Sequence, residues 1–168
     1  MRGGVQVRPQ YILAGSLAAV VVALDQLTKY LVQKSLILWT GIDVIPGFFS
    51  LVHSLNKGSA FGFMNHAGSV WQPYFFIAVT AFAIVIILNL LSKAPAGDKL
   101  FIISLGLILG GAVGNLIDRV RLGEVVDFLD FAIGSFHWPA FNVADMAISL
   151  GSMALIISFY MRGRPPKK

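Results

Sequence analysis

Four apolar segments constrain the fold of this chain more than any other feature. They cover roughly residues 11–34, 73–91, 100–117 and 142–161, and each is nearly free of charge at its centre. A helix crosses about 30 Å of hydrocarbon with about 20 residues. Only helices satisfy their own backbone hydrogen bonds in lipid without closing into a barrel, and these segments lack the alternation of barrel strands. We therefore predict a membrane α-helical fold, a four-transmembrane-helix bundle that forms a single domain over residues 1–168.

Composition agrees with a membrane protein and narrows the chemistry. The chain is 57% hydrophobic and only 12% charged, which is too apolar for a soluble domain. It contains no cysteine, so a disulfide, a thiol nucleophile and a cysteine-ligated metal are excluded. Its three histidines lack metal-ligand spacing such as HExxH. The basic residues flank the apolar segments, so the net charge of +5 does not indicate a nucleic-acid partner. We expect no metal and no cofactor.

The distribution of Lys and Arg predicts the orientation in the membrane. The N-terminus, the second connection and the C-terminus together hold eight basic residues and the single acid Asp98. By the positive-inside rule these three regions face the cytoplasm, and the acid-rich connections 35–72 and 118–141 face outward. Arg2 and Arg8 precede the first apolar segment as in a signal peptide. Because no small-residue cleavage site follows, we expect that segment to be retained as a membrane span.

The two outward connections carry different patterns. Residues 42–45, 48–55 and 59–64 are short, aromatic or β-branched runs separated by Gly and Pro, which predicts a small extracytoplasmic β-sheet between helices 1 and 2. Phe128–Phe141 is apolar but interrupted by Asp130, Gly134 and Pro139. This second pattern predicts a short interfacial helix or loop between helices 3 and 4.

The third apolar segment carries glycines at a spacing of four residues, at Gly106, Gly110 and Gly114. In membranes a stripe of small residues lets a neighbouring helix approach closely. We therefore place this helix at the centre of the bundle.

Several polar residues stand at the outward ends of these segments. Asp25 and Lys29 have the i, i+4 spacing of a favourable ion pair, which predicts structural support at the end of helix 1, with substrate positioning as the alternative. Asp118 is predicted to pair with Arg119 and to form a polar cap. An amide and a guanidinium such as Asn115 and Arg119 can grip backbone carbonyls of a substrate. Asn56 alone fits a turn.

Asp127 and Asp145 allow two interpretations. Asn142 can cap the fourth helix with Asp145 completing a capping-box variant, and Asp127 can be a carboxylate at the membrane interface. Alternatively the two aspartates face each other as a proteolytic pair, in which one carboxyl keeps a proton because both cannot readily ionise. Spacing alone leaves both interpretations open.

Five stretches match, in order and spacing, motifs of a known family. They are DQLTK (25–29), NKGSAFG (56–62), GGAVGNLIDR (110–119), VVDFLD (125–130) and FNVADMAI (141–148). Together they closely resemble the bacterial lipoprotein signal peptidases, the type II signal peptidases, over essentially the whole chain. Ser59 departs from the alanine expected in the second motif, a change that leaves the chemistry untouched.

This resemblance implies a multi-pass aspartic protease of the bacterial inner membrane that cleaves prolipoproteins before a diacylglyceryl-modified cysteine. Its catalytic residues correspond to Asp127 and Asp145. Contacts to the substrate, and to globomycin-type cyclic peptide inhibitors, correspond to Asn56, Asn115, Arg119 and Asn142. The resemblance further implies a monomer in contact with membrane lipids.

Two alternatives from other classes remain at this point. A small proton- or cation-coupled transporter would use the same carboxylates as a relay, but it requires polar residues at mid-membrane depth. A non-catalytic assembly protein would use the glycine stripe, and replacing its aspartates would alter association.

Overall fold

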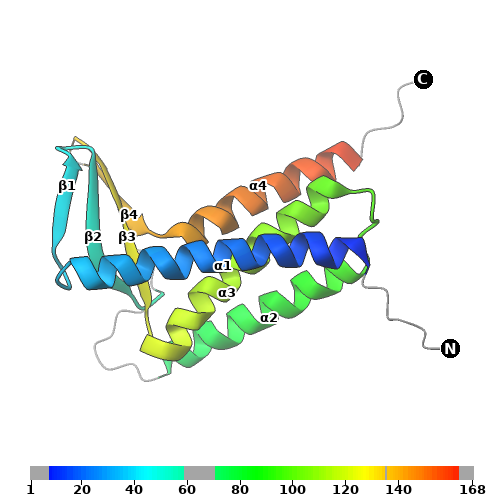
Figure 1. Ribbon diagram of the computed structural model, residues 1–168, viewed down its shortest axis with the longest axis horizontal. Coiled ribbons are helices and arrows are strands. Elements are labelled where there is room, and N and C mark those ends of the chain that lie inside the picture. The colour runs from blue at the N-terminus through cyan, green and yellow to red at the C-terminus, as the bar shows by residue number, and fades with distance from the viewer. Residues whose placement is uncertain (1–7, 59–70, 135, 163–168) are drawn as a thin grey trace.

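The computed structural model describes residues 8–58, 71–134 and 136–162. In these ranges four helices form the bundle and four strands form a sheet at one end of it (Figure 1). The helices are α1 Pro9–Ser35, α2 Gln72–Ser92, α3 Lys99–Leu122 and α4 Val143–Arg162. All four are long and apolar enough to cross a membrane. The described start of α1 and end of α4 lie at the end of the bundle opposite the sheet, as expected for four spans (Figure 1).

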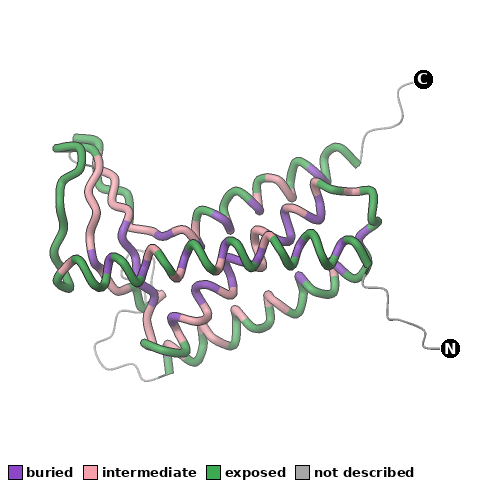
Figure 2. Tube along the Cα trace, in the orientation of Figure 1, coloured by how far each residue is buried: buried purple, intermediate pink, exposed green. Residues whose placement is uncertain are grey.

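Helix α3 lies at the centre of the bundle, as its glycine stripe predicts. In its most apolar window 56% of the residues are buried, against 22% or less in the other three helices (Figure 2). A Cβ added at Gly106 would lie 3.0 Å from the Ala14 carbonyl oxygen, and one at Gly110 would lie 2.9 Å from that of Ala18. Only hydrogen fits at such distances, so glycine permits the close contact between α1 and α3.

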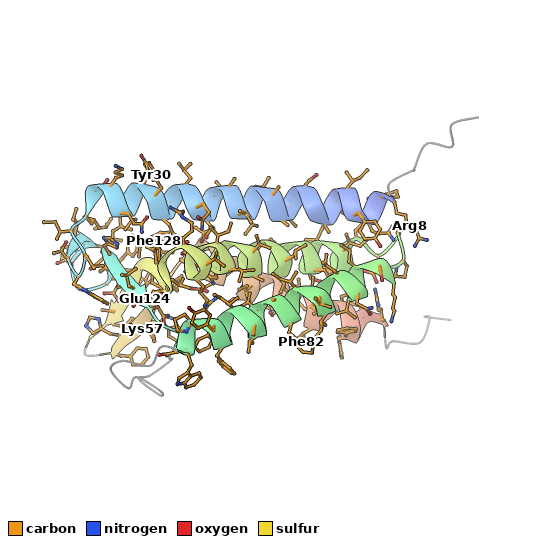
Figure 3. All side chains as sticks on the ribbon, turned by 90° about the horizontal axis from the view of Figure 1, so that it is seen from below. Arg8, Tyr30, Lys57, Phe82, Glu124 and Phe128 are labelled. Atoms are coloured by element: carbon orange, nitrogen blue, oxygen red, sulfur yellow. The ribbon has the colours of Figure 1, made fainter. Side chains whose placement is uncertain are left out.

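The outer faces of the helices are apolar and exposed. Tyr30 on α1 and Phe82 on α2 point away from the bundle, where the surrounding medium would be lipid (Figure 3). Helix α2 is the least covered of the four, with 11% of its apolar window buried. Such surfaces suit a membrane because packing against lipid tails requires no polar groups.

The sheet is antiparallel with the order β1-β2-β3-β4. Its strands are β1 Gly41–Ile45, β2 Phe49–Asn56, β3 Val125–Ile133 and β4 Phe136–Phe141. β1 and β2 confirm two of the predicted runs, and the third, residues 59–64, lies outside the described residues. β2 pairs with β3 so that Ser54 lies opposite Asp127. The sheet therefore joins the two outward connections, which are far apart in the sequence.

The prediction of an interfacial helix or loop over Phe128–Phe141 is wrong. These residues lie in the hairpin β3–β4, with Gly134 in a left-handed conformation at φ 61° where the chain turns. The aromatic and β-branched residues of β3 form a strand because β2 offers an edge to pair with. The paired residues are 69 to 82 positions apart in the sequence, from Asn56–Val125 to Phe49–Phe131, so no local pattern reveals the pairing.

Candidate active site

Polar side chains from all five matched stretches converge where the helices meet the sheet. They arise from the outer halves of α1 and α3, the first turn of α4, and strands β2 and β3. The predicted residues found here are Asp25, Lys29, Asn56, Asn115, Asp118, Arg119, Asp127, Asn142 and Asp145. They divide into a compensated ion cluster and a pair of carboxylates held by amides.

The ion cluster is built on Lys29, whose side chain is 3% exposed. Its Nζ lies 2.8 Å from Asp25 Oδ2 and 2.8 Å from Asp118 Oδ2. It also donates to Asn115 Oδ1 at 3.0 Å. Asp25 accepts the backbone N–H of Ala144 at 2.9 Å. The predicted Asp25–Lys29 ion pair is thus present, and it ties α1 to α3 and α4.

The predicted ion pair between Asp118 and Arg119 is absent, although the structure describes both residues. Neighbours on a helix diverge by about 100°, so Asp118 turns inward to Lys29 while Arg119 takes another direction. Asp118 also accepts the backbone N–H of Val126 at 3.2 Å. Asp118 thereby anchors the start of β3 at the residue that precedes Asp127.

Asp127 lies in β3 and is 2% exposed. Asn142 Nδ2 donates to its Oδ1 at 2.7 Å, and Asn56 Nδ2 donates to its Oδ2 at 3.0 Å. Pairing between β2 and β3 brings Asn56 to this position. Both carboxylate oxygens therefore face neutral amide donors.

Asp145 occupies the first turn of α4 and is partly exposed. Its backbone N–H donates to Asn142 Oδ1 at 2.9 Å, and the Asn142 N–H donates to Asp145 Oδ2 at 3.3 Å. This reciprocal arrangement confirms the predicted capping box. Asn115 Nδ2 donates to Asp145 Oδ1 at 2.8 Å. Capping and pairing with a second carboxylate are therefore compatible roles for one side chain.

Asn142 connects the two aspartates. It is fully buried, its side-chain amide donates to Asp127, and its backbone donates to Asp145. One residue thus contacts both carboxylates, although they are separated in the sequence by 18 positions and belong to a strand and a helix. The structure brings the predicted pair together around this asparagine.

Burial controls the ionisation of Asp127. Desolvation raises the pKa of Asp127 to about 7, and the nearby charge of Asp145 adds to this effect. Hydrogen bonds from Asn56 and Asn142 and the positive charge of Lys29 act in the opposite direction. A pKa near 7 lets this carboxyl hold or release a proton at neutral pH, as a general acid or base requires.

Arg119 extends from α3 and is partly exposed. Its guanidinium lies 5.5 Å from the ring centroid of Phe76 on α2, a cation–π contact. It interacts electrostatically with Asp145 and Asp127. It makes no hydrogen bond or ion pair with its side chain to any residue that the structure describes. Within the described residues, its five N–H donors therefore have no acceptor, and they lie near the two carboxylates.

A cavity of about 720 Å³ opens beside Asp145. Its walls are the hairpin β3–β4 and the first two turns of α4. Aromatic and aliphatic side chains dominate the lining, among them Phe131, Phe136, Trp138, Phe141, Met146 and Leu150. Asp145 and Ser149 provide the polar side chains in this otherwise apolar wall. In the described parts of the chain, no group of three His, Asp or Glu side chains is arranged to hold a metal ion.

Sequence reasoning missed three contributors to the site. Gln26 donates to Asp118 at 3.0 Å, Gly58 donates to the side chain of Asn56 at 2.8 Å, and Phe76 lies under Arg119. Gln26 and Gly58 both lie inside the matched motifs, which was the available signal. Phe76 is one of many aromatic residues in an apolar helix, so nothing in the sequence distinguishes it.

The fold and the site together define an integral membrane protein with a paired-carboxylate site. Residues 17–161 match the family model described as Signal peptidase (SPase) II. The lipoprotein signal peptidase of Maridesulfovibrio salexigens is 55% identical over 151 residues, which cover 90% of this chain and 97% of that protein. The chain belongs to the signal peptidase II family of bacterial membrane peptidases.

Further comparisons agree. The lipoprotein signal peptidase of Geobacter metallireducens is 45% identical over 161 residues, which cover 96% of this chain and 98% of that protein. A solved bacterial membrane enzyme, determined by the in meso method at 2.3 Å resolution, is 30% identical and superposes with a TM-score of 0.78. That superposition covers 92% of this chain and 93% of the other. The agreement extends over the bundle and the sheet together.

Proposed function

We propose that this chain removes signal peptides from bacterial prolipoproteins as an aspartic endopeptidase, with Asp127 and Asp145 as its catalytic pair. The observation that carries the proposal is the contact of one buried residue, Asn142, with both carboxylates. Cleavage falls before a cysteine that carries a diacylglyceryl group. No metal or cofactor takes part.

The chemistry follows from a shared proton. One carboxyl of the pair is protonated and the other is ionised, because two negative charges in a desolvated site repel each other. The ionised carboxylate takes a proton from water, and the water oxygen bonds to the scissile carbonyl carbon as the protonated carboxyl donates to the carbonyl oxygen. The C–N bond then breaks, and a carboxyl returns a proton to the leaving amine. The pair titrates as one unit, with Asp127 supplying a group whose pKa is about 7.

The asparagines and Arg119 have two different roles, orienting the carboxylates and contacting the substrate. Asn115 and Asn142 are buried, and they act on the substrate through the carboxylates that they orient. Arg119 and Asn56 are more exposed, and we assign to them the contacts with substrate carbonyls. Asp25, Lys29 and Asp118 provide the support beneath the site.

The apolar cavity supports a lipid-modified substrate. It begins at Asp145 and continues between β4 and the lipid-facing side of α4. An acyl chain attached near the scissile bond can lie against these side chains and remain in an apolar medium. The same surfaces would contact membrane lipids and the cyclic peptides of the globomycin type. We assign the enzyme as a monomer.

The orientation in the membrane follows from charge. With eight basic residues and one acid in the termini and the α2–α3 connection, that side faces the cytoplasm, and the sheet and active site face the periplasm. The membrane is accordingly the bacterial inner membrane.

The transporter alternative receives no support. Within the described helices the charged side chains lie toward the helix ends, and the buried serine Ser104 bonds to the backbone oxygen of Phe101 in its own helix. No chain of ionisable groups crosses the described part of the bundle. Membership in a peptidase family favours hydrolysis instead.

Cleavage by the purified protein in detergent tests the proposal. The substrate is a diacylglyceryl-modified prolipoprotein, and the mass of the product identifies the bond that is cut. Asp127→Asn and Asp145→Asn should each abolish cleavage, while Asp43→Asn, at an exposed aspartate of β1, should retain it. Circular dichroism and gel filtration verify folding of each variant. Full activity in either active-site variant eliminates the catalytic pair.

A further inference from the structure

Gly58 lies two residues past Asn56, the last residue of β2, and contacts Asn56 through its backbone. Its N–H donates to Asn56 Oδ1 at 2.8 Å. A backbone N–H can only donate, so the atom facing it must be the amide oxygen. The NH₂ end of Asn56 is thereby directed to Asp127 Oδ2 at 3.0 Å. The orientation of this amide is thus determined by an acceptor contact at one end and a donor contact at the other.

Two independent features require glycine at position 58. Its φ of +94° lies in the left-handed region that side chains disfavour. A Cβ added there would also lie 2.5 Å from Cε2 and 2.6 Å from Cδ2 of Phe76. Gly47 shares only the first feature, because its φ is +74° and nothing lies within 4 Å of an added Cβ. A side chain at position 58, but not at 47, must displace the turn or the aromatic ring.

We propose that Gly58 is a positioning residue, which holds the amide of Asn56 in the orientation that donates to Asp127. It thereby favours the ionised form of Asp127 without contacting the substrate. If the turn shifts, the amide loses its reference contact and can rotate, and its oxygen then faces the carboxylate. The proposal concerns the ionisation of Asp127, so it can be tested whether or not the peptidase assignment holds.

Replacing Gly58 neither adds nor removes a charged group around Asp127, but it can move Arg119 through the Phe76 ring, which Arg119 contacts. Asp145 from α4, Lys29 from α1 and Arg119 from α3 interact with Asp127 electrostatically. The exposed Lys57 and the half-buried Glu124 form an ion pair beside the turn, 3.6 Å apart, and lie close together in the side-chain view (Figure 3). A change in the titration of Asp127 therefore has two sources, the amide hydrogen bond of Asn56 and a displaced Arg119, and the double-mutant cycle below separates them.

The experiment measures the titration of Asp127 by carboxyl ¹³C NMR of the full chain in detergent, with the resonance assigned through Asp127→Asn. Gly58→Ala should raise the titration midpoint by about one pH unit, since a hydrogen bond to a charged group is lost. Gly47→Ala, the matched control, should leave it unchanged. Asn56→Ala removes the same donor while Gly58 is kept and no atom is added against Phe76, and it should produce the same upward shift, which covers the case in which Gly58→Ala does not fold.

A double-mutant cycle then separates positioning from a general disturbance. In the Asn56→Ala background, Gly58→Ala should cause no further shift of the midpoint, because the group through which it acts is absent. Shifts that add in full, or a midpoint that Gly58→Ala does not move, would overturn the proposal. If the unaltered protein does not cleave the prolipoprotein while the predicted NMR shifts are observed, the peptidase mechanism fails and the positioning role remains.

Discussion

Two acidic clusters lie side by side in this protein and differ in what neutralises them. In the ion cluster, Asp25 and Asp118 share the ammonium group of Lys29 at 2.8 Å each. In the carboxylate pair, Asp127 and Asp145 share the amide and backbone N–H groups of Asn142. The aspartates of the first cluster thus contact a full positive charge directly, whereas those of the second contact only N–H dipoles directly. The first arrangement suits support, and the second suits proton transfer.

Asn115 separates and connects the two clusters. Its Oδ1 accepts from Lys29 at 3.0 Å, while its Nδ2 donates to Asp145 at 2.8 Å. Lys29 therefore contacts the carboxylate pair only indirectly, through the Asn115 amide that it orients. A direct lysine contact would hold a carboxyl in its ionised form and oppose its protonation.

The largest effect on stability is expected from removing the positive charge of Lys29 from the ion cluster. Lys29→Met preserves the length of the side chain but leaves Asp25 and Asp118 buried without a cation. Breaking a buried ion pair in this way costs about 3–5 kcal/mol of folding free energy. Denaturant unfolding in detergent should show this loss. Lys34→Met, at an exposed position on the same helix, should change stability by less than about 1 kcal/mol.

Equal stability of the two lysine variants would mean that the cluster does not support the fold. A large loss for Lys29→Met that Asp25→Asn fails to relieve would point to lost packing instead of stranded charge.

Removing a charge from the carboxylate pair should stabilise the folded protein, whereas removing the charge of Lys29 should destabilise it. The pKa of Asp127 is raised to about 7 in the folded protein, so between its ordinary value of 3.8 and 7 the folded state binds more protons than the unfolded state. Stability must therefore fall as the pH rises through this window. The contribution is on the order of 4 kcal/mol. Asp127→Asn, which cannot ionise, should flatten this pH dependence and be more stable than the parent protein at neutral pH.

Unfolding curves at pH 4, 5.5 and 7 measure this difference. Asp43→Asn, at an exposed position, serves as the control because it should leave the slope of stability against pH unchanged. An Asp127→Asn protein that loses stability at neutral pH would show that the buried carboxylate is compensated in the folded state.

Features that depend on nearby residues were predictable from the sequence. The four spans follow from hydropathy, the Asp25–Lys29 pair from helical spacing, and the Asn142–Asp145 cap from a three-residue offset. Each of these needs only one helix or its end. The central position of α3 followed from its glycines for the same reason.

Features that depend on distant residues were not predictable. The pairing of Asp118 with Lys29 requires two helices to pack, and the formation of β3 requires the edge of β2. The sequence alone left the meeting of Asp127 and Asp145 open, because it depends on Asn142 lying between a strand and a helix. The resemblance to a known family implied that the two aspartates lie close together, and the structure shows how Asn142 links them.

The smallest expected effect concerns the apolar cavity beside the carboxylate pair. Leu150 lines it, while Met153, one turn further along α4, does not, although both are similarly exposed, at 54% and 57%. Leu150→Trp should fill part of the cavity and raise the KM for a lipid-modified substrate about threefold to tenfold, the equivalent of about 1 kcal/mol. Met153→Trp adds the same bulk on the lipid-facing side and should leave the KM unchanged. Substrates with short acyl chains should lose less affinity in Leu150→Trp, because less of the chain must enter the filled region. Equal effects of both tryptophans, or of long and short chains, would show that the acyl group lies elsewhere.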